Sequence, residues 1–209
     1  MGWASCGLPE GQWGEFAPTA TYVKRYCQAG VVPIHKKMDD GGHIGTEGDR
    51  DRMRMTRSRP LPGHFMDIAM EEARAAARRG EVPVGAALSG PDGRLLARAG
   101  NRVEEWGDPS AHAEMLVMRT AGMQRVGLRL AGCTLYVTLE PCPMCAAAAT
   151  HFRVGRIVFG AYDPKGGGVE HGPRLFAQPR CLHRPETVGG VREREAGQLL
   201  REFFQRLRA

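Results

Sequence analysis

The spacing of apolar residues divides the chain into two parts. Residues 1–62 show neither helical nor strand periodicity, whereas apolar positions recur at regular intervals between residues 63 and 209. The first periodic segment, residues 65–79, places its apolar side chains on one face of a helix, and Gly80 is suited to end that helix. The pattern therefore predicts one folded domain over residues 63–209.

The remaining periodic segments alternate between strand and helix. A hairpin is predicted where two apolar runs flank the turn Gly-Pro-Asp-Gly at residues 90–93. The predicted strands are residues 82–89, 94–99, 134–139, 155–160 and 186–188, and the later helices are residues 111–120, 142–151 and 193–208. Because helices and strands alternate after an initial hairpin, the sequence predicts an α/β domain with a mixed five-stranded sheet between two helix layers.

The first 62 residues are predicted to be a disordered extension. They are rich in glycine and charge, and residues 49–59 form a charge run that is followed by Pro60 and Pro62. Such a segment buries too little apolar surface to offset the entropy of ordering it. Two alternatives stay open: a basic arm that grips RNA, and a true start at a later methionine (Met53, Met55 or Met66).

Composition narrows the cellular setting. No apolar run approaches the roughly 18 residues of a membrane span, and no apolar signal-peptide core follows a basic start. We therefore expect a cytoplasmic protein that does not associate with a membrane. The formal net charge of +6 and the pI of about 9.2 suit a polyanionic partner.

Two of the six cysteines, Cys142 and Cys145, are close together in the sequence. In a chain that is expected to be cytoplasmic, a single Cys-x-x-Cys motif favours metal binding or redox chemistry over a disulfide framework. At spacing i, i+3 in the first turn of a helix both thiols point the same way, and the helix dipole favours the thiolate form that zinc binds. His112, also at a predicted helix start, offers a third ligand, which leaves zinc's fourth position open as in catalytic sites.

Glu114 distinguishes a hydrolytic zinc site from a structural one. Zinc lowers the pKa of a bound water from about 15.7 to about 7, and a neighbouring group must then accept and deliver the proton. In an ideal helix, positions i and i+2 point about 200° apart, so His112 and Glu114 would not face one metal. We therefore expect His112 to occupy the non-helical cap position.

These residues carry a family resemblance. His112-Ala-Glu114 followed by Pro141-Cys-Pro-Met-Cys145 resembles the signature of the cytidine deaminase superfamily. The longer context is similar to bacterial tRNA-specific adenosine deaminases and covers residues 64–208. The matching pieces are EVPVGA at 81–86, Asn101, DPSAHAE at 108–114, LYVTLEPC at 135–142, GRIVFG at 155–160 and the terminal Phe203-Phe204.

The resemblance implies a three-layer α/β/α cytidine-deaminase-like fold and hydrolytic deamination of adenosine to inosine at the tRNA wobble position. His112, Cys142 and Cys145 would hold one zinc ion, and zinc-bound hydroxide would attack C6 of a flipped-out adenine. Glu114 would move the proton to N1 and then to the leaving amine, a role that typically contributes 10²–10⁴-fold. The expected substrate-binding residues are Asn101, Val84 and Leu139.

The resemblance also implies partners: the anticodon stem-loop of a tRNA and a second copy of the chain in a homodimer. Small residues at positions 146–149 would allow close helix approach in such a dimer. The candidate RNA-contact residues are Lys165, Phe203, Phe204, Arg206 and Arg208. The chain departs from many relatives at Leu182-His183, where they carry two adjacent histidines.

Two other functions stay open at this point. A deaminase of a free base or nucleoside, of the guanine or cytosine type, would use the same zinc chemistry. A zinc-stabilised RNA-binding module without catalysis would share the ligands but has no need of Glu114. We also expect Cys133 to be a core residue, and Cys181 with His183 is a candidate second metal site.

Overall fold

The computed structural model describes residues 62–123 and 129–208. The predicted extension lies outside the described residues except for Pro62. The predicted domain at residues 63–209 is described apart from residues 124–128 and 209. Within the described ranges, no helix combines the length and apolarity that a membrane span requires.

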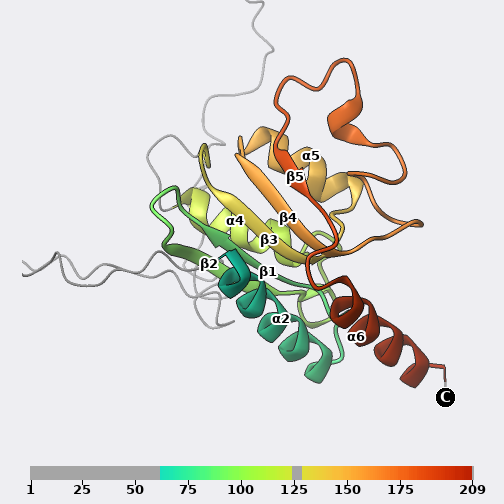
Figure 1. Ribbon diagram of the computed structural model, residues 1–209. Helices are drawn as coiled ribbons and strands as arrows, with labels where there is room; N and C mark the ends of the chain where they lie inside the picture. The colour runs from blue at the N-terminus through green and yellow to red at the C-terminus, as the bar shows by residue number, and fades with distance from the viewer. Residues whose placement is uncertain (1–61, 124–128, 209) are drawn as a thin grey trace, which may run out of the picture.

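Five strands form one mixed sheet in the order β2-β1-β3-β4-β5 (Figure 1). The strand β1 pairs antiparallel with β2 and with β3, whereas β4 runs parallel to β3 and to β5. The strands are β1 (Gly85–Ser89), β2 (Leu95–Gly100), β3 (Thr134–Leu139), β4 (Arg156–Ala161) and β5 (Glu186–Val188). The predicted five-stranded mixed sheet is confirmed.

Four helices cover the two faces of the sheet. The helices α2 (Pro62–Arg78) and α6 (Glu193–Arg206) cover one face, and α4 (Ala113–Met123) and α5 (Pro143–His151) cover the other (Figure 1). Alternate residues of the strands face opposite layers: Leu88 packs in the core with α4 and α5, whereas Ala87 packs with α2. This alternation produces the predicted three-layer arrangement.

Two short helices are absent from the sequence prediction. The helix α3 (Val103–Trp106) connects β2 to α4, and the 3₁₀ turn η3 (Leu175–Ala177) lies between β4 and β5. The start of α4 also differs from the prediction, at residue 113 rather than 111. Asp108 accepts a hydrogen bond from the Ser110 N–H and forms a turn before the helix, while Asn101 Oδ1 accepts the Ala113 N–H at 2.9 Å.

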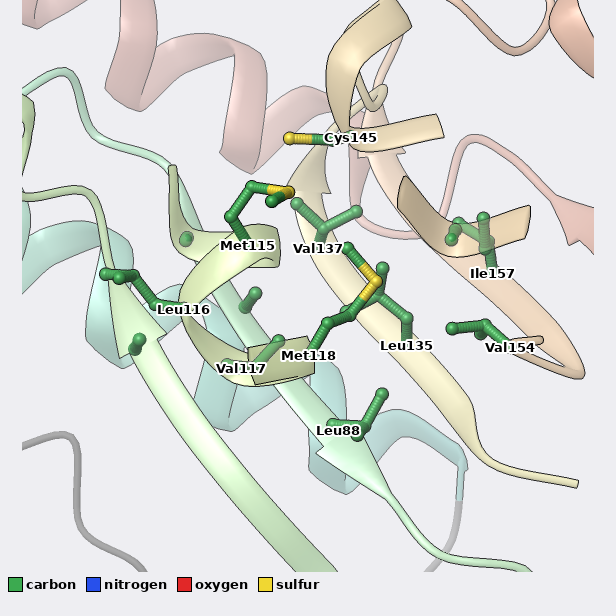
Figure 2. Packing of buried hydrophobic residues seen from close by; sticks show 14 of the residues in the cluster. Leu88, Met115, Leu116, Val117, Met118, Leu135, Val137, Cys145, Val154 and Ile157 are labelled. Carbon is green, nitrogen blue, oxygen red and sulfur yellow. The ribbon is translucent and has the colours of Figure 1, made fainter. Parts of the chain in front are cut away.

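The larger core lies between the sheet and the layer formed by α4 and α5. Its fully buried members include Leu88, Leu116 and Met118, and Figure 2 shows Cys145 at the end of this cluster where Met115 and Val137 also lie. The sulfur of Cys145 is therefore fixed by close packing of its helix on the sheet.

Candidate active site

His112 precedes α4 and lies at its cap position. The Leu116 N–H donates to the His112 carbonyl at 3.0 Å, so His112 accepts the first hydrogen bond of the helix while remaining outside it. Glu114 is the second residue of α4. The different backbone geometry of the two residues removes the 200° conflict that two helical positions would have.

Cys142 has the corresponding position at the start of α5. Its φ of −66° and ψ of 168° are extended, and the Ala146 N–H donates to its carbonyl at 2.9 Å. Pro143 occupies the first helical position, where a missing N–H costs nothing. Cys145 follows in the first turn and is fully buried.

The three predicted ligands converge on one point. Nδ1 of His112 lies 3.7 Å from the Cys142 sulfur and 3.6 Å from the Cys145 sulfur. A tetrahedral zinc with ordinary Zn–S and Zn–N bonds separates such atoms by about 3.6 Å. All three ligand atoms lie within 4.8 Å of one another, so the geometry fits a zinc ion.

The charges of the site also fit a cation. Hydrogen bonding with Cys145 lowers the pKa of Cys142 to about 4, and the hydrogen bond with Cys142, together with burial, raises the pKa of Cys145. A divalent cation allows both to ionise, because it offsets the repulsion between adjacent thiolates.

Glu114 is buried beside these ligands. The residue is 3% exposed, and its Oε2 has no hydrogen-bond partner in the described part of the chain. Burial raises the pKa of Glu114 to about 7, against the effects of its own backbone, His112 and Cys145. A carboxyl with that pKa and one uncommitted oxygen can accept and return a proton near neutral pH.

Asn101 lies at the end of β2 and contacts the same helix end. Its Oδ1 accepts the Ala113 N–H, and its side-chain nitrogen makes no hydrogen bond to the described residues. The residue therefore caps α4 next to His112 and still offers an amide donor to a ligand. Sequence reasoning assigned it only the second of these roles.

Val84 and Leu139, the other predicted substrate contacts, lie in the core. Val84 is 6% exposed, and Leu139 is partly buried at the end of β3. Val84 belongs to the apolar cluster that contains Cys145, and Leu139 packs against that cluster. The structure thus places them in the layer of the metal site, largely covered by neighbouring side chains.

The predicted RNA-contact residues are separated into two regions. Lys165 is exposed in the loop after β4, whereas the others are on or just beyond α6, which covers the opposite face of the sheet from α5 (Figure 1). Within the helix, Phe203 is buried at 7% exposure and Phe204 is 42% exposed. Only Phe204 of this pair presents its ring to solvent in the way that base stacking requires.

The other two cysteines in the described ranges, Cys133 and Cys181, are not part of the metal cluster. Cys133 is fully buried in the core, as expected. The Cys181 thiol donates to the His183 carbonyl, and the His183 ring contacts the Val154 carbonyl at 2.6 Å. Among the residues that the structure describes, the only cluster suited to a metal is that of His112 and the two cysteines of α5.

Sequence reasoning left one buried residue of this region, Glu140, without a role. It is 2% exposed and accepts hydrogen bonds from the backbone of Asp163, Val169, Glu170 and His171. Its position directly before Pro141-Cys142 was the available signal. The sequence does not reveal its partners, because they lie 23 to 31 residues away.

Comparison with known proteins agrees with this geometry. The family model for the cytidine and deoxycytidylate deaminase zinc-binding region matches residues 62–161. A tRNA-specific adenosine deaminase of Agrobacterium fabrum is 52% identical over 145 residues, covering 69% of this chain and 95% of the relative. The enzyme of the same name from Bacillus subtilis is 48% identical over 144 residues, covering 69% of this chain and 89% of the relative.

A solved structure gives the same result. It comes from a study of A-to-I editing by tRNA:A34 deaminases at the wobble position, and it superposes with a TM-score of 0.64 at 51% identity. The match covers 66% of this chain and 99% of that structure. The chain therefore belongs to the zinc-dependent cytidine and deoxycytidylate deaminase family, in the branch of the tRNA-specific adenosine deaminases.

Proposed function

We propose that this protein hydrolytically deaminates adenosine to inosine at the wobble position of a tRNA. The observation that carries the proposal is the metal triad of His112, Cys142 and Cys145 with the buried, partly unpaired carboxylate of Glu114 beside it. Relatives that match over nearly their whole length and are named for tRNA adenosine deamination support the choice of substrate.

The residues of the site divide the chemistry between them. His112, Cys142 and Cys145 would hold the zinc ion, which when bound lowers the pKa of a water molecule and so supplies a nucleophile. Glu114 accepts one proton of the attacking water and delivers it to N1 of the adenine as the new C6–O bond forms. It then takes the remaining proton from the C6 hydroxyl group and passes it to the amine, so that the C6–N bond breaks and the amine leaves. The products are inosine and ammonia.

The base is held from the Asn101 side of the site. The free amide nitrogen of Asn101 would donate a hydrogen bond to the flipped-out nucleotide, while its oxygen keeps α4 in place. Val84 and Leu139 would form the apolar wall against which the base packs. A buried amide that recognises one polar atom of the base favours the correct substrate, because a mismatched one leaves that amide unpaired.

The RNA around the target base would meet positive charge. Lys165, Phe204, Arg206 and Arg208 are exposed and are the proposed RNA contacts, through phosphate groups and one stacking ring. We further propose that the enzyme works as a cytoplasmic homodimer. Ala146 and Ala149, from the segment expected at the interface, are instead buried in the core, so the proposed interface is the exposed part of α5 around Met144. Residues 63–209 would make up the deaminase domain.

One assay tests the proposal against its alternatives. Zinc-loaded protein is incubated with an anticodon stem-loop carrying a wobble adenosine, and separately with free adenosine, guanine and cytosine, and inosine and ammonia are measured. We expect inosine only in the stem-loop. Turnover of a free base in place of the stem-loop would identify a small-molecule deaminase, and tight RNA binding without product would identify a binding module.

A further inference from the structure

The carboxylate of Glu140 lies at the end of β3, two residues before the metal ligand Cys142, and is fully buried. It accepts hydrogen bonds from the backbone N–H groups of Asp163, Val169, Glu170 and His171. The group is therefore a buried carboxylate that depends on its hydrogen-bond donors to remain there.

All of these donors belong to one loop, residues 163–171. Oε2 accepts the Asp163 N–H at 3.1 Å, and Oε1 accepts the N–H groups of Val169, Glu170 and His171 at 3.2, 2.8 and 2.9 Å. The His171 ring adds a contact from Nδ1 to Oε2 at 2.7 Å. A single side chain thus holds the loop at both of its ends.

Glycines allow this loop to lie directly against the start of α5, which we call the metal helix because it carries Cys142 and Cys145. A Cβ on Gly167 would lie 2.6 Å from the Glu140 carboxyl carbon, and a Cβ on Gly168 would lie 2.7 Å from the Pro143 nitrogen. The Gly168 N–H donates to the Pro141 carbonyl at 2.9 Å. The inner side of the loop therefore contacts Pro141 and Pro143, the two neighbours of Cys142 in the chain.

The loop has an inner and an outer side. Val169 is 6% exposed and belongs to the same apolar cluster as Cys145. Lys165, in contrast, is exposed, and its backbone N–H is held by the Asp163 carboxylate at 3.1 Å. An ordered loop next to the metal site thus carries a cation on its free side.

We infer that Glu140 is a positioning residue, which holds loop 163–171 on the metal helix so that the loop presents a fixed surface to the nucleotides beside the target base. This inference rests on the proposed function. A loop that is already ordered spares the substrate the entropy of ordering it. Releasing the loop therefore weakens RNA binding more than it slows the chemical step.

Hydrogen exchange measured by mass spectrometry on the zinc-loaded protein tests the first part of this inference. In Glu140→Ala, the amides of residues 169–171 should exchange at least about tenfold faster than in the wild type, because they lose their acceptor. Glu140→Gln keeps one acceptor oxygen and should give an intermediate rate. Unchanged exchange in both variants would overturn the inference.

Glu81 provides the matched control. It is also a buried carboxylate, 1% exposed, and it accepts the N–H groups of Glu104 and Glu105 at 3.3 and 2.9 Å. Glu81→Gln should speed exchange at residues 104–105 and leave residues 169–171 unchanged. If it affected both segments equally, the link between Glu140 and its loop would not be specific.

Kinetics with the anticodon stem-loop test the second part. In Glu140→Gln, KM should rise about tenfold with kcat within about threefold of the wild type, and the zinc content should stay at one ion per chain. A loosened loop with unchanged KM, or loss of zinc, would overturn the positioning role. If the wild-type protein does not act on the stem-loop, the proposed function is wrong. The hydrogen-exchange measurement would still test whether Glu140 keeps loop 163–171 in place.

Discussion

At the scale of single residues, the cap positions of two helices determine the geometry of the site. His112 and Cys142 each lie one residue before a helix, and each carbonyl accepts the first helical hydrogen bond. Their side chains can therefore reach a point that is also within reach of residues in the first turn, Glu114 and Cys145. Shifting either helix start by one residue would separate the ligand from its neighbour.

Asn101 gives a prediction at this scale, because its two side-chain atoms have different tasks. Asn101→Asp keeps an oxygen for the Ala113 N–H and loses the amide donor. We expect unchanged thermal stability and a fall in kcat/KM of about tenfold, the effect of losing one hydrogen bond to the substrate. Thermal unfolding and steady-state kinetics on the stem-loop measure the two effects.

Asn101→Ala is the companion variant. It removes both atoms, so it should lower kcat/KM in the same way and also destabilise the protein by about 1 kcal/mol through the lost helix cap. Full activity of Asn101→Asp would show that the amide does not contact the substrate. Equal stability of wild type and Asn101→Ala would contradict the capping role.

At the scale of the elements, the close approach of α2 to the sheet depends on glycine in β1. A Cβ on Gly85 would overlap the Ala69 carbonyl oxygen and the Ala73 nitrogen, both of which are backbone atoms of α2. Gly85→Ala should therefore destabilise the protein by about 2 kcal/mol, because the helix must move away from the sheet. Chemical denaturation of the zinc-loaded protein measures this.

Gly90 is the matched control for that prediction. A Cβ there would contact the Asp92 side chain at 2.7 Å, and this exposed side chain can rotate away. We expect Gly90→Ala to cost less than about 1 kcal/mol. If the two variants unfold at the same denaturant concentration, close helix–sheet contact at Gly85 is not a source of stability.

The sequence predicted the regular elements well, because local patterns encode them. The strands at residues 134–139 and 186–188 have the predicted bounds, and the turn at 90–93 forms with a Gly93 N–H to Gly90 carbonyl bond at 3.0 Å. Gly80, with a φ of 83°, follows the end of α2 as predicted. The metal ligands were also recognisable, because their spacing and residue types are specific to this chemistry.

The missed features depend on contacts between distant parts of the chain. The short helix α3 is held by the carboxylate of Glu81, which accepts two of its N–H groups from more than 20 residues away. The start of α4 was misplaced because its cap is supplied by Asn101 rather than by the preceding Asp108. Glu140 was left without a role for the same reason, since only the folded chain brings its loop to it.

At the scale of the whole molecule, the two helix layers have different roles. The layer of α4 and α5 carries the metal site, whereas α2 and α6 form the opposite layer and are joined by ion pairs. Arg74 pairs with Glu195, and Arg192 pairs with both Asp67 and Glu195. The pairs of Arg74 with Glu195 and of Arg192 with Asp67 connect α2 to the start of α6, the helix that leads to the proposed RNA-contact residues Arg206 and Arg208.

The net charge of +6 leads to a prediction about RNA binding. The affinity for the stem-loop should fall linearly on a plot of log K against log salt, since phosphate contacts release counterions. Lys165→Ala and Arg206→Ala should each reduce the slope by about 0.7 to 0.9 for each lost phosphate contact. Fluorescence anisotropy over a range of salt concentrations measures the slope.

Arg94→Ala is the control for those variants. Arg94 is an exposed cation in the β1–β2 turn and is paired with Asp92. Its removal should leave the slope unchanged. If all three variants reduced the slope equally, RNA binding would depend on total charge rather than on the proposed contact residues.

The most direct test of the proposed mechanism is a substitution of Glu114. The zinc content and the rate of inosine formation are measured on the same preparation of the variant. The variant Glu114→Gln keeps the shape of the side chain but cannot move a proton. We predict one zinc ion per chain by elemental analysis, with inosine formation in the wobble stem-loop reduced by about 10²–10⁴-fold or more in single turnover. Normal inosine formation by the zinc-loaded variant, or loss of its zinc, would contradict the role of Glu114 as the group that moves the proton.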